Sequence, residues 1–252
     1  MRRSVRRCVD ELAAIGVGGR SRARNIPLPP RRLRAGGEHF RGDAEFVESG
    51  RVEARSLAAD GCLTSTSSLL DFGCGAGRLA VGLLEEEAPL ERYAGVDVRA
   101  SVIRWAHRNL ARLDQRFSFV HMDVANQRYN PRGQPFQEQH LPFGDMTFTT
   151  AYSYSVFSHL RIEDTRLAFR ELRRVVRNGS LVVITGFVDD SVNGLVVNPS
   201  EYGALSWRGP LHCVLYQRSL FETIARDQGF EVSRMTYRSE TDGQSRYVFK
   251  AV

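Results

Sequence analysis

The stretch that decides the fold is Leu69-Leu70-Asp71-Phe72-Gly73-Cys74-Gly75-Ala76-Gly77-Arg78. An apolar run ends in an acid, three glycines follow in G-x-G-x-G spacing, and apolar residues then recur at helical intervals up to Leu84. This pattern predicts a buried strand, a tight turn and the start of a helix. Glycine has no Cβ and tolerates positive φ, so such a turn can bring bare N–H groups and a helix N-terminus against a ligand. A plain strand-to-helix turn is the alternative.

Strands and helices alternate along the rest of the chain. Short apolar runs predict further strands, and apolar residues at intervals of three and four predict helices between them. The predicted strands are 67–72, 93–97, 116–121, 147–152, 180–186, 230–237 and 245–252, and the predicted helices are 43–59, 78–87, 100–113, 161–176 and 218–228. We therefore expect an α/β fold, an open, mostly parallel sheet with helices on both faces and an antiparallel pair of strands at its end.

Residues that can carry chemistry follow four of the predicted strands at their carboxyl ends. They are Asp71 with its glycine turn, Asp97, Asp123 and Ser153. Ligands of open α/β sheets bind at this edge, next to the point where the strand order reverses. The same pocket edge is thus indicated by four separate stretches, which is stronger evidence than one glycine motif.

Three parts are expected along the chain. Residues 1–35 form a basic arm and linker, 36–60 a helical lid over the ligand or a cap on the sheet edge, and 61–252 the main domain. The segment 187–216 interrupts the alternation and is rich in glycine, proline, asparagine and aromatic residues. A stretch of that length is usually functional. We expect it to be an apolar lid over an acceptor, or a contact in a homodimer.

The net charge of +6 is concentrated at one end. Ten of the 35 basic residues lie within 1–35, and the remaining residues carry 25 basic and 27 acidic side chains. The body is therefore no basic platform for nucleic acid, and we expect a small-molecule partner instead. No run of 18 apolar residues occurs, so no membrane span is expected. The four scattered cysteines indicate neither a metal site nor disulfides, and favour a cytoplasmic location.

Two kinds of nucleotide cofactor compete for the glycine turn. Dinucleotide folds have G-x-G-x-x-G, but here the third glycine comes one residue early and Arg78 occupies the position of that motif's last glycine. Asp71 lies two residues before the first glycine, where its carboxylate would repel a phosphate and attract an ammonium group. The turn therefore favours a cofactor with an amino group, and a dehydrogenase is a distant alternative.

These residues resemble the first motif of the class I S-adenosylmethionine-dependent methyltransferases, and the resemblance extends over residues 61–252. It implies a seven-stranded sheet of order 3-2-1-4-5-7-6 with strand seven antiparallel, S-adenosylmethionine as cofactor and S-adenosylhomocysteine as product. It also implies roles for individual residues. The methionine end would be held by Asp71, Gly73, Cys74, Gly75 and Gly77, the ribose by Asp97, the adenine by Val98, Asp123 and Val124, and the sulfonium side would be lined by Ser153.

Two positions depart from the family's pattern. Strand four usually opens with Phe-Asp, whereas Phe148 is followed by Thr149, and the turn before strand five usually reads Pro-Gly-Gly, whereas this chain has Asn178-Gly179-Ser180. Neither position normally contacts the cofactor, so the resemblance survives both departures.

His159 is the candidate catalytic residue, because methyl transfer to a hydroxyl requires a base and imidazole can titrate near neutral pH. A role in holding its loop is the alternative. The leading hypothesis is a cytoplasmic methyltransferase acting on a small or medium-sized metabolite, with O-methylation ahead of N-methylation. An RNA or protein methyltransferase that uses the basic arm, and a non-catalytic nucleotide-binding module, are the other hypotheses.

Overall fold

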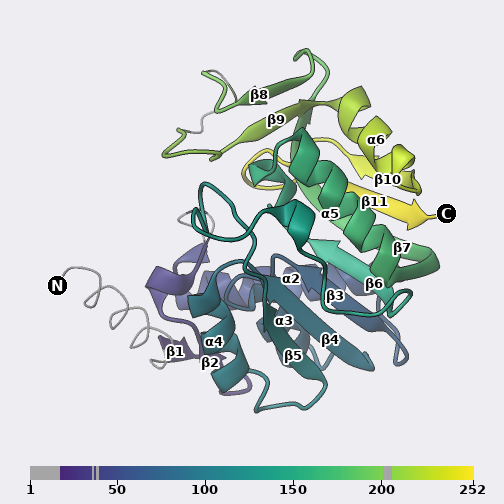
Figure 1. Cartoon of the computed structure of the whole chain (residues 1–252). Helices are drawn as coiled ribbons and strands as arrows, with labels where there is room; N and C mark the ends of the chain where they lie inside the picture. Colours follow the sequence, from purple (N-terminus) through teal and green to yellow (C-terminus); the bar gives the residue numbers. More distant parts are fainter. Residues whose placement is uncertain (1–17, 36, 38–39, 201, 203–205) are drawn as a thin grey trace. The chain divides into compact units, whose positions relative to one another are not determined.

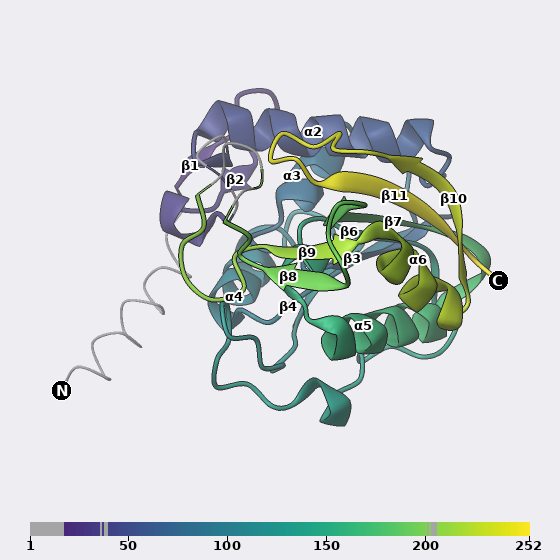
Figure 2. The same cartoon turned by 90° about the horizontal axis from the view of Figure 1, so that it is seen from above.

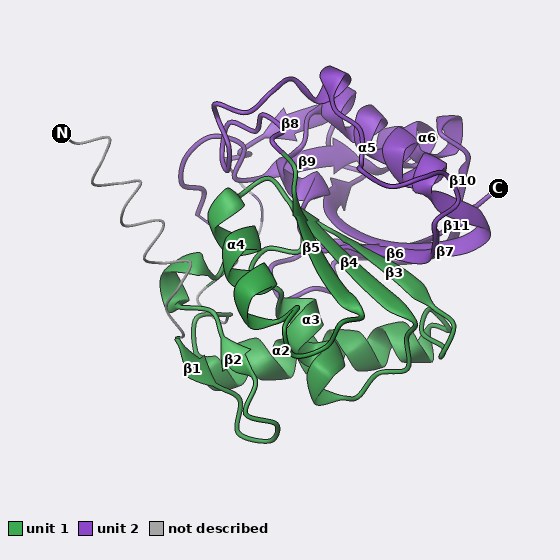
Figure 3. Cartoon of the chain, turned by 60° about the horizontal axis from the view of Figure 1, so that its bottom comes forward, with its two compact units in different colours: residues 1–122 green, residues 123–252 purple. Residues whose placement is uncertain are grey.

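A computed structural model describes residues 18–35, 37, 40–200, 202 and 206–252. It divides into two compact units, residues 1–122 and 123–252 (Figure 3). The division falls inside the predicted 61–252 domain, between the third and fourth predicted strands. The first part of the predicted basic arm, residues 1–17, lies outside the described residues.

Residues 18–35 of the predicted arm are folded in unit 1. Strands β1 (Gly19–Arg20) and β2 (Pro27–Leu28) pair antiparallel, and a short 3-10 helix, η1 (Arg31–Leu33), follows. Leu28 is fully buried, although its stretch reads as a stiff connector. The Arg34 guanidinium is buried and forms an ion pair with Asp43. This arginine therefore serves the unit's own packing.

Helices α2 (Asp43–Ala59) and α3 (Arg78–Glu85) pack closely in unit 1. The contact is made at two glycines. A Cβ on Gly50 would lie 2.3 Å from the Arg78 carbonyl oxygen, and a Cβ on Gly82 would lie 2.0 Å from the Gly50 carbonyl oxygen. Only glycine allows the two backbones to approach this closely. The predicted 36–60 helical segment is thus packed on the helix that follows the glycine turn.

The unit 1 sheet has three parallel strands in the order β3-β4-β5. They are β3 (Ser68–Phe72), β4 (Arg92–Asp97) and β5 (Phe117–His121), and α4 (Ala100–Asn109) connects β4 to β5 along the chain (Figure 1). Asp71 pairs in register with Gly95. The predicted strands and their neighbours in this part of the sheet are confirmed.

The main sheet of unit 2 has the order β10-β11-β7-β6. Its elements are β6 (Phe148–Ser153), α5 (Ile162–Val175), β7 (Val176–Asp189), α6 (Arg218–Asp227), β10 (Phe230–Thr236) and β11 (Ser245–Ala251). β6 and β7 are parallel, whereas β11 is antiparallel to both of its neighbours. This is the predicted 4-5-7-6 order, so the fold class, α/β and mostly parallel with antiparallel C-terminal strands, is confirmed.

The predicted end of α5 is wrong by one residue, and the predicted start of β7 is wrong by four. The helix ends at Val175 and β7 begins at Val176, so the Asn178-Gly179 turn lies within the strand and not before it. Val176 already pairs with Phe148, and the next pair, Thr150 with Leu181, follows after a register shift. The extra residues of β7 form this irregularity, in which Gly179 adopts a φ of +79°. Pairing with β6 thus overrides the local turn signal.

The predicted irregular segment 187–216 contains regular structure. β7 continues to Asp189, β8 (Leu195–Val197) pairs antiparallel with β9 (Val214–Gln217), and β9 pairs parallel with β7 (Figure 2). A cluster of buried side chains lies beneath, formed by Phe187, Tyr202, Cys213 and Leu215, with Val192 and Trp207 packed against it. The apolar residues of the segment therefore build a small core of their own.

Candidate functional site

The glycine turn of unit 1 has the conformation that its sequence predicts. Gly73, Gly75 and Gly77 have φ values of +84°, +54° and +80°, a region that side chains with a Cβ rarely adopt. At Gly77 a Cβ would also lie 2.6 Å from Cδ1 of Leu110. At Gly75, in contrast, no atom of the described residues lies within 4 Å of the Cβ position, so these residues leave open space beside this backbone.

Strand β4 holds the turn through its last residues. The backbone N–H groups of Gly73 and Cys74 donate to the Val96 carbonyl oxygen at 2.8 and 2.9 Å. The Gly75 N–H donates to Oδ2 of Asp97 at 2.9 Å, and the Arg99 N–H donates to Oδ1 at 2.8 Å. Burial raises the pKa of Asp97, and these two donors oppose that rise. Asp97 is therefore held in one orientation with lone pairs left for a diol.

Asp71 is buried, with an exposed fraction of 3%. The Tyr93 hydroxyl, on the neighbouring strand, donates to its Oδ2 at 2.6 Å. Burial raises the pKa of Asp71 to about 7, although the Tyr93 hydroxyl and the positive charge of Arg78 both lower it. Tyr93 was not predicted as a site residue. The available signal was its position four residues before Asp97, which places both side chains on the same face of one strand.

Cys74 and Val98 complete the predicted residues of unit 1. Burial raises the pKa of the Cys74 thiol well above its usual range, so the thiol stays protonated. A Cβ on Gly95 would lie 2.8 Å from the Cys74 sulfur, so β4 requires glycine at position 95. The Val98 carbonyl oxygen lies 3.1 Å from Nε2 of His121.

Asp123 and Val124 begin unit 2, in a loop that closes on itself. The Asn130 side chain donates to Oδ1 of Asp123 at 3.0 Å and to the Val124 carbonyl oxygen at 3.1 Å. Val124 also forms a parallel bridge with Gln134. The exposed Asp123 carboxylate is therefore held by its own loop.

Ser153, the last residue of β6, is fully buried, and a buried polar network follows it. Ser155 adopts a φ of +57°, its N–H donates to Thr185 Oγ1 at 2.8 Å, and its hydroxyl accepts a 2.9 Å bond from the Gln244 amide. A positive φ in a residue with a Cβ is strained and is common at functional sites. The sequence gives no sign of the partner, since Gln244 lies 89 residues away.

His159 is buried, with 7% of its surface exposed, and both ring nitrogens have partners. Nδ1 lies 2.8 Å from the Leu211 carbonyl oxygen, which can only accept, so this nitrogen carries the proton. Nε2 therefore accepts a 3.2 Å bond from the Tyr129 hydroxyl. Burial lowers the pKa of His159 to about 4, although the Leu211 carbonyl acts to raise it. The imidazole is thus neutral at physiological pH.

The same loop that holds Asp123 also holds His159. The Asn126 side chain donates to the His159 carbonyl oxygen at 3.1 Å and accepts from the Tyr129 N–H at 3.1 Å. Unit 2 thus connects Asp123 and His159 through residues 124–130, while Ser153 has a separate setting at the end of β6. Neither Asn126 nor Tyr129 was predicted, because loop residues carry no periodicity.

Asp189, at the carboxyl end of β7, is the centre of another polar cluster. Its Oδ1 accepts from the N–H and hydroxyl of Ser191, and its Oδ2 accepts from the Tyr237 hydroxyl at 2.8 Å and the Arg238 guanidinium at 2.6 Å. Burial raises the pKa of Asp189, but these donors outweigh it and lower the pKa to about 2. The Arg238 guanidinium also lies 4.6 Å from the centre of the Tyr202 ring.

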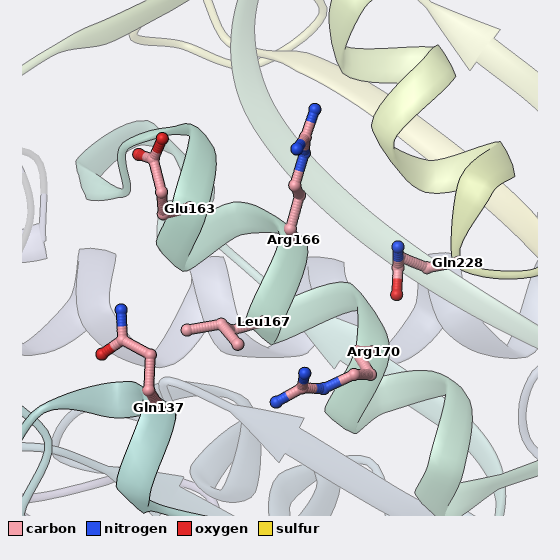
Figure 4. A pocket seen from close by; sticks show the side chains of 6 residues that line it. All are labelled: Gln137, Glu163, Arg166, Leu167, Arg170 and Gln228. Carbon is pink, nitrogen blue, oxygen red and sulfur yellow. The ribbon is translucent and has the colours of Figure 1, made fainter.

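A surface depression of about 370 Å³ lies on unit 2. Its lining comes mainly from one face of α5, where Glu163, Arg166, Leu167 and Arg170 project, together with Gln137 and Gln228 (Figure 4). None of the predicted site residues lines it. Its charged side chains are those of an ordinary solvated helix face.

Comparison with known families identifies the central part of the chain. Residues 70–184 match a family model described as a methyltransferase domain. This range contains the glycine turn, all the predicted cofactor residues and His159.

Solved structures share the fold over most of the chain. Magnesium protoporphyrin IX methyltransferase from Synechocystis with bound S-adenosylmethionine is 15% identical, with 88% of this chain and 89% of that chain covered and a TM-score of 0.56. A glycopeptide N-methyltransferase complexed with S-adenosylhomocysteine is 14% identical, with coverage of 81% and 90% and a TM-score of 0.58. A [4+2]-cyclase is 20% identical, with coverage of 92% and 70% and a TM-score of 0.52.

The residues of unit 1 fit the cofactor that such proteins bind. Space lies open beside Gly75, the Asp97 carboxylate is oriented by backbone donors, and a buried carboxylate at Asp71 suits an ammonium group. The cyclase shares this fold, so one fold hosts more than one reaction. The family match and the shared architecture agree on the class. The chain has the class I, Rossmann-like fold of the S-adenosylmethionine-dependent methyltransferases, and its residues 70–184 match a methyltransferase domain.

Proposed function

We propose that this methyltransferase methylates a small or medium-sized metabolite, and that a hydroxyl oxygen is the acceptor atom ahead of an amine nitrogen. The observation that carries this proposal is the His159–Tyr129 pair, an unprotonated imidazole nitrogen hydrogen-bonded to the hydroxyl of a partly exposed tyrosine. A hydroxyl acceptor must lose a proton during transfer, whereas an amine with a free lone pair need not. A built-in proton acceptor therefore favours O-methylation.

The cofactor, when bound, supplies an electrophilic methyl group on a sulfonium sulfur. The proposed holding residues are those of the family motif. Asp71 and the backbone of Gly73 to Gly77 hold the methionine end, Asp97 the ribose hydroxyls, and Val98, Asp123 and Val124 the adenine, with Ser153 on the sulfonium side. Positioning of this kind accounts for much of the acceleration of a displacement reaction.

The proposed path of the proton runs through Tyr129 to His159. When the bound cofactor supplies its methyl group to the acceptor oxygen, the acceptor proton would pass to the Tyr129 oxygen, and the Tyr129 proton would pass to Nε2 of His159. The Leu211 carbonyl accepts from Nδ1 and so stabilises the cation that forms. Because the pKa of His159 is low, Nε2 stays unprotonated down to mildly acidic pH. The same low pKa makes the imidazole a weak base.

The small-acceptor proposal is supported by what the related proteins act on. Two of them are named for magnesium protoporphyrin IX and for a glycopeptide, which are small or medium-sized molecules. The segment 187–216 places aromatic side chains next to the carboxyl end of β7, including Trp207, which is only partly buried. We propose that this segment borders the acceptor, with a homodimer contact as the alternative role.

An RNA or protein substrate held by the basic arm is the second candidate. The test must leave the described part of the arm in place. Residues 18–35 are packed, so a deletion that extends beyond residue 17 would damage unit 1. We therefore choose deletion of residues 1–17 alone. Unchanged turnover of a small acceptor by this variant supports the leading proposal, whereas methylation of RNA or protein that the deletion abolishes supports the second.

A reducing compartment such as the cytoplasm is the proposed location. Among the described residues, Cys62, Cys74 and Cys213 are buried and take part in no disulfide. No helix among the described residues is long and apolar enough to cross a membrane.

Labelled methyl transfer to panels of hydroxyl, carboxylate and amine compounds tests the proposal. We expect turnover of a hydroxyl compound, a loss of about 100-fold in kcat for His159→Gln, and a smaller loss for Tyr129→Phe. At saturating cofactor, kcat should stay level as the pH falls from 8 to about 5, because His159 stays neutral. An acidic limb near pH 6.5, or transfer to amines alone, contradicts the base role.

A further inference from the structure

We propose that Tyr93 is a positioning residue for the cofactor: its hydroxyl orients the Asp71 carboxylate and favours the ionised form, which is the form that attracts the cofactor's ammonium group. The inference rests on the proposed role of Asp71 in binding the cofactor's ammonium group. Tyr93 belongs to no part of the family motif and lies inside a strand that reads as structural.

The geometry singles out this pair. Tyr93 is fully buried, and its hydroxyl reaches Oδ2 of Asp71 at 2.6 Å across the β3–β4 ladder. In the part of the chain that the structure describes, this hydroxyl is the one hydrogen-bond donor to the carboxylate. A buried carboxylate with a single neutral donor is poorly stabilised in its charged form.

The Tyr93 side chain is fixed by its own surroundings. Its ring stacks on Phe117 with centroids 5.0 Å apart and contacts Phe119 at 5.6 Å. The ring therefore delivers its hydroxyl to one place. A hydrogen bond from a preorganised donor orients the carboxylate and lowers its pKa.

The other charged groups near Asp71 come from the elements packed against it, and they oppose one another. Arg78 at the start of α3 lowers the pKa of Asp71, whereas Asp97 on β4 and Glu53 on α2 raise it. With burial as the largest effect, the pKa lies at about 7. Cys74, the other titratable neighbour, stays protonated because burial raises the pKa of its thiol.

The consequence is a proton that competes with the cofactor. An ammonium group is attracted to the ionised form of Asp71 and gains little from the protonated form. Affinity should therefore rise with pH until Asp71 is ionised in the free protein. Loss of the Tyr93 donor raises the pKa of Asp71 and moves this dependence to higher pH.

Calorimetric titration of the full chain with S-adenosylhomocysteine from pH 6 to pH 9 tests the inference. The quantity compared is the ratio of Kd for Tyr93→Phe to Kd for wild type, in which the titration of the ligand's own amine cancels. For a rise of about one pKa unit, we expect a ratio of about 10 at pH 6, about 5 at pH 7 and about 1 at pH 9. A ratio that is the same at every pH means that Tyr93 has only a packing role, and overturns the proposal.

Two further variants sharpen the result. Tyr247→Phe is the matched control, because Tyr247 is a fully buried tyrosine whose hydroxyl also bonds a carboxylate, Glu222, outside the predicted site. Its ratio should be about 1 throughout. In an Asp71→Asn background, Tyr93→Phe should have no further effect on Kd at any pH.

The outcomes separate this inference from the proposed function. Wild-type chain that binds S-adenosylhomocysteine while Tyr93→Phe binds equally well overturns the role of Tyr93 and leaves the cofactor assignment intact. Wild-type chain that fails to bind at every pH contradicts the cofactor role of Asp71 itself. Thermal unfolding of each variant shows whether the fold is retained.

Discussion

The cofactor-motif residues of unit 1 and the polar residues of unit 2 are held by different means. In unit 1, each of two carboxylates accepts a hydrogen bond from a group 22 residues away in the sequence. The Tyr93 hydroxyl donates to Asp71, and the backbone N–H of Gly75 donates to Asp97. In unit 2, Asp123 is held by its own loop, but other polar groups meet from remote segments. His159 bonds Leu211 52 residues on, and Ser155 bonds Gln244 89 residues on.

This difference indicates which residues of such a protein can be substituted. A turn built from backbone N–H groups and glycine conformations tolerates few substitutions, because a Cβ at Gly77 would collide with Leu110. A network of side chains from distant loops can be rebuilt residue by residue. We expect unit 1 to respond to mutation in ligand binding, and unit 2 in stability and substrate choice.

The largest expected effect is on the backbone-held carboxylate of unit 1. Asp97→Ala removes the acceptor of two backbone N–H bonds and the proposed ribose contact, so S-adenosylhomocysteine should bind about 100-fold more weakly, or about 3 kcal/mol. Isothermal titration measures this loss. Asp114→Ala, which breaks a partly exposed pair with Arg116, is the control and should bind normally. Equal affinity of both variants would contradict the proposed role of Asp97 in ligand binding.

The second effect concerns stability and His159. Its pKa of about 4 in the folded state lies below the value of about 6.5 in an unfolded chain, so between these values only the unfolded state takes up the proton. Stability is therefore retained above pH 6.5 and lost as the pH falls toward 4, by about 2 kcal/mol between pH 7 and pH 5.

Urea unfolding of wild type and His159→Gln at pH 7 and pH 5 measures this effect. The variant should lack this part of the pH dependence, so the difference between the two proteins should shrink on acidification. His107→Gln, at an exposed position on α4, should behave as wild type. An unchanged pH dependence in His159→Gln would mean that another group is responsible.

The smallest effect is expected at the Asp189 cluster. The folded-state pKa of Asp189, about 2, lies below its unfolded value, so its contribution is present above about pH 4 and is lost as the pH falls toward 2. Because Arg238 is 42% exposed, solvent screens the pair and we expect Arg238→Gln to cost about 1 kcal/mol at pH 7. A double-mutant cycle with Asp189→Asn measures the coupling, and additive effects would show that the pair contributes nothing.

Much of the fold could be predicted from the sequence, because its signals are local. The run from Leu69 to Arg78 contains its own strand, turn and helix start, and the positive φ values of its glycines follow from residue type. The prediction failed where a neighbouring strand decided the conformation. Asn178-Gly179 reads as a turn, yet pairing of Val176 with Phe148 draws it into β7.

By itself, the sequence determined the fold class, the glycine turn and the acidic residues at the strand ends, since each depends on a few consecutive residues. Only the tertiary structure decided which side chains assist them. It brought Tyr93 to Asp71, Tyr129 and Leu211 to His159, and Arg238 to Asp189. The physical reason is that a hydrogen bond requires two groups within about 3 Å, and for residues far apart in sequence only the folded packing sets that distance.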